Sequence, residues 1–148
     1  MAIARGPGKI YMNAKVFFDT NVLVYAAVGT GKDKPKQKRA LELIASEDFG
    51  TSAQVLQEFF VTVVKKASRP LSAAQALEWI EQWIVFPCLD IDHQLVRIAI
   101  ELSEHYAISY WDAAIIAAAE ALGSHTVYSE DLNDSQQYGI VKVVNPFS

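Results

Sequence analysis

The sequence predicts an α/β fold with three layers, in which a central, twisted, parallel sheet of about five strands carries helices on both faces. Two observations favour this class. Short apolar runs such as VFF at residues 16–18 lack the polar alternation of a half-exposed strand, which is typical of strands covered on both sides. Helical segments separate these runs, and strands that alternate with helices favour a parallel sheet.

The N-terminal half is expected to contain two strand–helix units. Two glycines and Pro35 predict a loop in the segment VGTGKDKPK. Beyond this loop, apolar residues fall on one helical face until about Ala45. We expect strands in this half at about 15–18 and 49–52, and helices from about 21, at about 37–45 and at about 52–66.

The C-terminal half is ordered by signals for helix starts. Ser72, Asp92 and Ser109 each stand as an N-cap before a periodic segment, and Gly123 ends the last helix. The segment EDLNDSQQYG is expected to connect the last two strands. We expect helices here at about 72–83, 92–105 and 109–123, and strands at about 84–91, 125–129 and 140–144.

Length and composition indicate one globular domain. A chain of 148 residues is typical of a single domain, and its 51% apolar content excludes a disordered chain. One cysteine cannot form an internal disulfide, which suits a reducing cytoplasm. No apolar run reaches the ~20 residues needed to span a bilayer, and the start lacks the apolar region of a signal peptide. We expect residues 1–11 to be an N-terminal extension, residues 12–148 to be one domain, and the protein to be cytoplasmic.

The charge is unevenly distributed. A formal net charge of −4 argues mildly against a protein that coats nucleic acid electrostatically. Basic residues nevertheless gather at two places, and each group is interpreted either as solvated surface or as a contact to a polyanion. The first group is Lys32, Lys34, Lys36, Lys38 and Arg39, and the second is Lys65, Lys66 and Arg69.

Four acidic residues stand where the predicted sheet would bring them to one edge. Asp19 directly follows the first strand, and Asp131 follows the strand at about 125–129. Asp112 lies in the first turn of the helix before that strand, and Glu58 lies on the helix after the second strand. Ligands of open α/β sheets bind outside the carboxyl ends of the strands, so these acids are candidates for one site.

Each of these acids also has a structural explanation. Asp19 could cap the helix that follows it, and Asp112 could complete a capping box with Ser109. On a helical wheel Glu58 falls away from the apolar stripe, as a solvated side chain would. Asp131 could stabilise an Asx turn. Two neighbouring acids compete for the fourth position, Glu130 and Asp134.

Acids that converge in one crevice repel each other unless a cation lies between them. A hard divalent cation such as Mg²⁺ fits, because it prefers oxygen ligands and keeps several waters. The sequence has no CxxC or HxxxH spacing for zinc and no candidate Ser-His or Cys-His pair for covalent catalysis. The GTGK segment at 29–32 lacks the first Gly and the Ser or Thr of a phosphate-binding loop.

Four segments, in this order, resemble the PIN-domain family, and most closely the VapC-type toxins of bacterial toxin–antitoxin pairs: FFDTNVLVYA, TSAQVLQEFF, ISYWDAAIIAAAEALG and VYSEDL. The resemblance extends from Met12 to Phe147. It implies a PIN-like version of the predicted sheet and a Mg²⁺- or Mn²⁺-dependent endoribonuclease. The acidic positions of the family match Asp19, Glu58, Asp112 and Asp131, and its supporting polar positions match Asn21 and Ser129.

The resemblance also implies roles for these residues. Three acids, Asp19, Asp112 and Asp131, would be direct or water-mediated metal ligands. Glu58 would orient or deprotonate the attacking water, and Asn21 would hold the Asp19 carboxylate or a substrate phosphate. The first basic group would contact the RNA backbone. The possible RNA contacts are therefore Lys32, Lys34, Lys36, Lys38 and Arg39.

Toxins of this family act as homodimers and are inhibited by an antitoxin, so the resemblance implies a second copy and a cognate antitoxin as partners. Trp79 and Trp83 lie one helical turn apart and are interpreted either as anchors for a partner or as core residues. Two alternatives to the nuclease remain. One is a catalytically silent binding module of the same fold. The other is a phosphate-transferring enzyme with Asp19 as nucleophile, although Asn21 replaces the second Asp of the D-x-D pattern that such enzymes use.

Overall fold

The first strand of the chain forms the centre of the sheet. The computed structural model describes residues 13–148, and the expected N-terminal extension at 1–11 lies outside the described residues. In this structure β1 (Val16–Phe18) pairs in parallel with β2 (Phe49–Ser52) on one side and with β4 (Thr126–Tyr128) on the other. The full strand order is β3-β2-β1-β4-β6-β5, so the predicted α/β class is confirmed.

The outer strands differ in two ways from the expected ones. At one edge β3 spans only Cys88–Leu89, because Pro87 has no N–H with which to extend the parallel pairing toward its N-terminus. At the other edge β6 (Val141–Val144) is preceded by an additional antiparallel strand, β5 (Gln137–Tyr138). A two-residue turn with Gly139 at φ +59° joins them, as a tight hairpin requires. A two-residue strand is too short to show periodicity, so the sequence did not predict β5.

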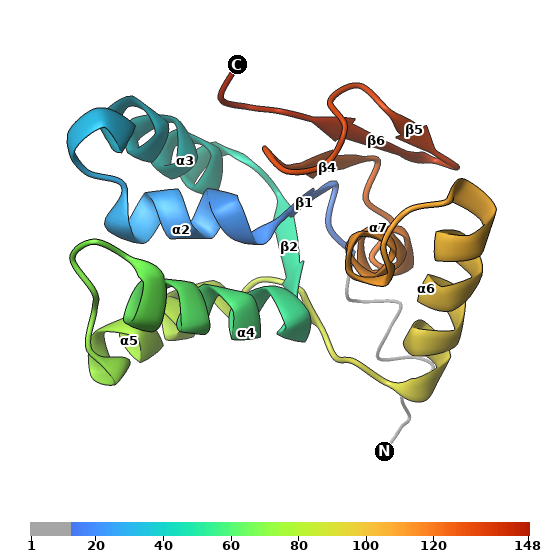
Figure 1. Ribbon diagram of the computed structural model, residues 1–148, viewed down its shortest axis with the longest axis horizontal. Coiled ribbons are helices and arrows are strands. Elements are labelled where there is room, and N and C mark those ends of the chain that lie inside the picture. The colour runs from blue at the N-terminus through green and yellow to red at the C-terminus, as the bar shows by residue number, and fades with distance from the viewer. Residues whose placement is uncertain (1–12) are drawn as a thin grey trace.

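Helices cover both faces of the sheet. Right-handed crossovers from β1 to β2 and on to β3 place their helices on one face, and the return from β3 to β4 places its helices on the other. Figure 1 shows the two groups at opposite sides of the strands. The first group is α2 (Thr20–Val28), α3 (Lys34–Ser46), α4 (Ala53–Val61) and α5 (Ala73–Trp83), and the second is α6 (His93–Tyr106) and α7 (Tyr110–Ala121).

Two short helical turns accompany these helices. The 3₁₀ turn η1 (Gly31–Asp33) leads directly into α3, which begins three residues earlier than expected because its first turn tolerates Pro35. After α4 the chain continues as a π-helical turn, η2 (Thr62–Lys66). Within residues 13–148, no helix is both long and apolar enough to cross a membrane.

The core is packed with aromatic and alanine side chains. Phe17 and Phe18 of β1 are fully buried, and the ring of Phe18 stacks on that of Phe49 with centroids 4.5 Å apart. Every residue of α7 from Ala113 to Ala119 is buried, because small side chains let this helix lie against both the sheet and α6. Trp83 also belongs to the core.

Trp83 is 2% exposed and its ring lies 4.9 Å from that of Phe59, so it is a core residue and not an anchor for a partner. Trp79 is partly buried against it, with ring centroids 5.5 Å apart. The core interpretation is therefore correct for Trp83, whereas Trp79 packs against the core with part of its surface exposed.

The chain leaves β1 and β4 in opposite directions, and this places a crevice between their carboxyl ends. From β1 the chain passes through α2 and α3 to β2, whereas from β4 it goes to β6 on the other side. Such a switch point is where open α/β sheets bind ligands. Asp19 and Ser129 are the residues that directly follow the two strands, and the Asp19 N–H donates to Tyr128 O at 3.0 Å.

Candidate functional site

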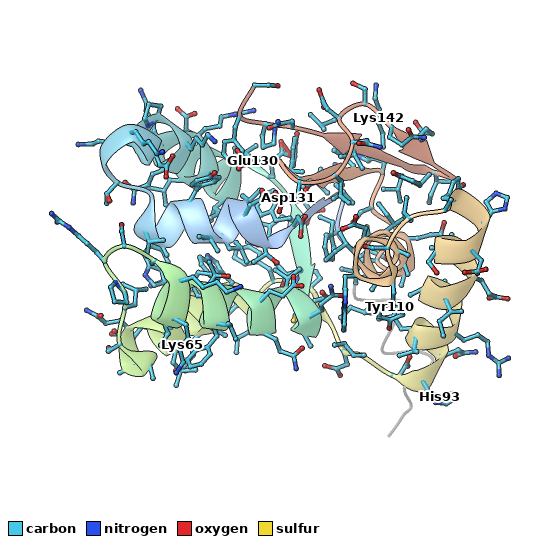
Figure 2. All side chains as sticks on the ribbon, in the orientation of Figure 1. Lys65, His93, Tyr110, Glu130, Asp131 and Lys142 are labelled. Carbon is cyan, nitrogen blue, oxygen red and sulfur yellow. The ribbon has the colours of Figure 1, made fainter. Side chains whose placement is uncertain are left out.

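An open cleft of about 440 Å³ lies beyond the carboxyl ends of β1 and β4. Asp19, Glu58, Asp112 and Asp131 all line it, so the fold brings together the four acids singled out from the sequence. Figure 2 shows Asp131 in the middle of the molecule, beside the start of α2. The rest of the wall is formed by Thr20, Gln54, Gln57, Val61, Thr62, Lys66, Trp111 and Ile115.

Asp19 is the most buried of the four acids, with 7% of its surface exposed. Its Oδ1 accepts a hydrogen bond from the Thr20 N–H at 2.7 Å, so Asp19 does cap α2 as expected. Its Oδ2 accepts from the Ser129 hydroxyl, also at 2.7 Å. Burial raises the pKa of Asp19 to about 6 against the effect of these two bonds, and the negative charges of Asp131 and Glu58 raise it further.

Ser129 organises the turn that follows β4. Besides donating to Asp19, its Oγ accepts from the N–H groups of Asp131 at 3.1 Å and Leu132 at 3.2 Å. The turn is therefore stabilised by the serine hydroxyl, and the expected Asx turn of Asp131 is not what forms it. As a result, the carboxylate of Asp131 faces the cleft.

Asn21 connects α2 to the same turn. Its side-chain N–H donates to Asp131 Oδ2 at 3.2 Å, and its Oδ1 accepts from the Glu130 N–H at 3.2 Å. The resemblance implies that Asn21 holds the Asp19 carboxylate or a substrate phosphate. In the structure Asn21 bonds Asp131 and not Asp19, whose two oxygens are bonded by Thr20 and Ser129, and the contact to a phosphate stays a prediction.

The two competing acids for the fourth position have other partners. Glu130 forms an ion pair with Lys36 at 2.6 Å and also accepts from the Tyr25 hydroxyl. Asp134 accepts from the Asn145 N–H at 2.8 Å. Of the three acids in this segment, Asp131 is the one that lines the cleft.

Glu58 reaches the cleft from α4. Its Oε1 accepts from the Thr20 hydroxyl at 2.7 Å, and its Oε2 lies 3.5 Å from the side-chain nitrogen of Gln54. As the helical wheel predicts, Glu58 lies on a face of α4 away from the buried Phe59, and Gln54 lies on the same side one turn earlier. This polar face lines the cleft and is not the solvated surface that the wheel suggested.

The sequence analysis did not single out Gln54 or Trp111. Gln54 is 7% exposed, and its side chain also donates to the backbone oxygen of Trp111 at 3.4 Å, which links α4 to α7. The only sequence signal for Gln54 was its place one turn before Glu58. Asp112 follows Trp111 in the first turn of α7, where its N–H donates to Ser109 Oγ at 3.1 Å while its side chain lines the cleft.

The first basic group lies apart from the cleft. Lys36 pairs with Glu130, and its Nζ lies 4.9 Å from the centroid of the Tyr25 ring, so its charge is already balanced. Arg39 donates to the backbone oxygen of Pro146 at 3.3 Å. The remaining members, Lys32, Lys34 and Lys38, are exposed. The basic residue that lines the cleft is Lys66, from the second group.

The donor set of the cleft suits a hard cation. Carboxylates and neutral oxygen donors line it, without His or Cys, and these are the groups that Mg²⁺ and Mn²⁺ prefer. The buried, partly neutral Asp19 is a group whose ionised form a cation would stabilise. Within residues 13–148, no three His, Cys, Asp or Glu side chains form a ready cluster of ligands. The cleft therefore suits a cation that keeps most of its waters and takes one or two carboxylates directly.

A family model of the PIN domain matches residues 16–137. Among solved structures, a toxin–antitoxin complex from Klebsiella pneumoniae is 18% identical, with 89% of this chain and 98% of that chain covered and a TM-score of 0.66. The VapC20 toxin from Mycobacterium tuberculosis, which cleaves the Sarcin-Ricin loop, is 20% identical, with 78% and 89% covered and a TM-score of 0.61.

A DNA-bound VapBC complex from Salmonella typhimurium is also 20% identical, with 88% of this chain and 96% of that chain covered and a TM-score of 0.60. At these identities the likeness shows a shared fold. No curated protein matches the sequence significantly.

Proposed function

Because the chain belongs to the PIN-domain family, we propose that it is a metal-dependent endoribonuclease that acts as the toxin of a toxin–antitoxin pair. The observation that carries this proposal is the meeting of Asp19, Glu58, Asp112 and Asp131 in one cleft at the switch point of the sheet. The likeness of the fold to VapC20 and to the toxin–antitoxin complex supports the same conclusion.

Three acids, Asp19, Asp112 and Asp131, are the proposed direct or water-mediated ligands of Mg²⁺ or Mn²⁺. When bound, such an ion lowers the pKa of a water and offsets the charge that develops on a phosphodiester during cleavage. The protein contributes the orientation of its ligands. Ser129 and the Thr20 N–H hold both oxygens of Asp19, and Asn21 holds Asp131.

Glu58 is the proposed residue that orients the attacking water or takes its proton. Its two oxygens are held by Thr20 and Gln54, so the carboxylate keeps one orientation at the wall of the cleft. A general base must lie within hydrogen-bond reach of the proton that it accepts, and the position of Glu58 in the same cleft as the proposed ligands supports this role. The alternative of Asp19 as a nucleophile is disfavoured, because both of its oxygens are hydrogen-bonded and it is nearly buried.

The proposed partners follow from the same assignment. The similar structures include toxin–antitoxin complexes, so we propose a cognate antitoxin for this chain as well. We further propose that the protein acts in the cytoplasm as a homodimer on an RNA substrate.

The proposal is tested by RNA cleavage with three variants. Wild type should cleave RNA with Mg²⁺ or Mn²⁺ and stop when EDTA is added, while Asp19→Asn and Asp112→Asn should stay folded and lose activity by at least ~100-fold. The control is Glu101→Gln, which removes one exposed acid of α6 far from the cleft and should cleave like wild type. Induced expression of wild type and of Glu101→Gln should arrest growth, whereas expression of Asp19→Asn and of Asp112→Asn should not. Equal toxicity of wild type and Asp19→Asn, or a folded wild type without activity in either metal, would favour the silent binding module.

A further inference from the structure

Trp111 exposes 63% of its surface although it lies beside Asp112 in the wall of the cleft. Its backbone oxygen accepts a hydrogen bond from the side-chain N–H of Gln54. Its ring meets the ring of Tyr110 edge to face, with centroids 5.0 Å apart. The backbone of Trp111 is therefore bonded at the start of α7, while its indole remains largely open to solvent. An exposed indole at a candidate active site is a surface on which a planar ligand can stack.

Lys66 is the basic residue that lines the same cleft. Gln54, Glu58, Thr62 and Lys66 lie four positions apart, and all four line the cleft. In a regular α-helix such positions drift by about 40° per step, which over three steps would turn Lys66 away from Gln54. The π-helical turn η2 has more residues per turn and rotates the chain back. Lys66 therefore stays on the cleft side, where a phosphate would meet it.

An RNA strand in this cleft meets four carboxylates, which repel its phosphates except where the proposed cation lies between them. Stacking of a base on an aromatic side chain is a source of affinity that does not depend on the net charge of the cleft. The first basic group cannot provide the compensation inside the cleft, because Lys36 is paired with Glu130 and none of its members lines the wall.

We propose that an unpaired nucleotide of the substrate stacks its base on Trp111 and places a backbone phosphate against Lys66, so that a single strand crosses the cleft between α7 and α4. This inference rests on the proposed function and names the class of substrate for that site. Bases of a duplex are already stacked and paired, so only a single strand, loop or bulge can offer a base to the indole.

The test measures binding of a short, fluorescein-labelled, mixed-sequence single-stranded oligoribonucleotide by anisotropy, with Ca²⁺ in place of Mg²⁺ to prevent cleavage. Trp111→Ala should weaken binding by about 5-fold to 150-fold, whereas Trp111→Phe, which keeps a stacking surface, should stay within a few-fold of wild type. The same sequence as a blunt duplex should bind wild type and Trp111→Ala equally. Because Trp111 is largely exposed, neither variant should change the unfolding midpoint.

Lys66→Gln should lower the slope of log affinity against log salt by about 0.7, as expected for the loss of one phosphate contact to a single strand. The matched control is Lys65→Gln, which removes the same charge from the neighbouring exposed residue outside the cleft wall and should leave the slope near that of wild type. Equal slopes for the two variants would overturn the Lys66 contact.

One further outcome would overturn the inference, namely an unchanged affinity of Trp111→Ala for the single strand. The proposed function can fail independently of this inference. A wild-type protein that binds the strand through Trp111 and Lys66 but cleaves no RNA would contradict the nuclease proposal and leave the binding site supported.

Discussion

The hydroxyl of Ser129 donates a hydrogen bond to Oδ2 of Asp19 at 2.7 Å, across 110 positions of the sequence. This bond joins the residues that follow two adjacent parallel strands and lies between the carboxylate of Asp19 and the turn that carries Asp131. Ser129 therefore contacts two of the proposed metal ligands through one hydroxyl, which donates to the Asp19 carboxylate and accepts from the backbone N–H of Asp131.

Ser129→Ala should destabilise the metal-free protein in a pH-dependent way. Removing the hydroxyl takes one partner from a buried carboxylate, which costs about 1–3 kcal/mol of unfolding free energy when Asp19 is ionised and less when it is protonated. Urea unfolding at pH 8 and at pH 4.5 measures the difference. The control is Ser124→Ala, which removes an equally buried hydroxyl that donates to the neutral backbone oxygen of Ala14 at 2.7 Å. Its cost should be the same at both pH values, and a pH-independent cost for Ser129→Ala would contradict the coupling to Asp19.

Asp19→Asn should stabilise the metal-free protein above pH 6 and not at pH 4. The pKa of Asp19 in the folded protein is raised by burial from 3.8 to about 6, so its contribution to stability is fully present below pH 3.8 and is lost as the pH rises through 6. The difference between these values corresponds to roughly 3 kcal/mol at most. The unfolding free energies of wild type and Asp19→Asn should therefore diverge between pH 4 and pH 7. Parallel curves over this range would show that Asp19 titrates normally.

Mg²⁺ or Mn²⁺ should raise the unfolding temperature of wild type at pH 7.5 and much less at pH 5. A cation favours the ionised form of Asp19, and protons compete with it once the pH falls below about 6. A ligand present at 100 times its Kd adds about 2.7 kcal/mol of stability, which is measurable as a thermal shift. Asp112→Asn should lose most of this shift, while the exposed Glu101→Gln should keep it. A shift that is the same in both variants would place the cation elsewhere.

Lys36→Met should lower RNA cleavage without weakening RNA binding. Lys36 pairs with Glu130, the neighbour of Asp131, and this pair ties the turn after β4 to α3. Loosening the turn should misplace Asp131 and reduce cleavage by roughly 10-fold to 100-fold. The pair itself is half-exposed, so a double-mutant cycle with Glu130→Gln should give a coupling of only about 0.5–1 kcal/mol, reduced by salt. Lys34→Met is the control on the same helix and should change neither property. A loss of binding with normal turnover would return Lys36 to the RNA contacts predicted from the sequence.

The sequence alone determined the fold class and the order of most elements, and it singled out the four acids that line the cleft. Local chemistry explains why: Ser72, Asp92 and Ser109 cap helices through bonds to N–H groups within three residues, so their motifs can be read without the fold. The short edge strands were less accessible. The two residues of β5 are defined by pairing with β6 and the turn at Gly139, and not by a periodic pattern of their own.

The tertiary structure decided how the candidate residues are used. Whether Glu130, Asp131 or Asp134 faces the cleft depends on their contacts to Lys36, Asn21 and Asn145. Lys36 and Asn21 lie 94 and 110 positions from the acids that they contact, and Asn145 lies 11 positions from Asp134. The pKa of Asp19 depends on burial that only the packed sheet and α2 provide. Glu58 is a cleft residue and not a solvated side chain, because α2 and α7 both contact the face of α4 that carries it. Thr20 of α2 bonds Glu58 itself, and Trp111 of α7 bonds Gln54 one turn earlier. The orientation of the acids, the pKa of Asp19 and the position of Glu58 all depend on contacts between segments that are far apart in the sequence. Reading one short segment at a time therefore cannot predict them.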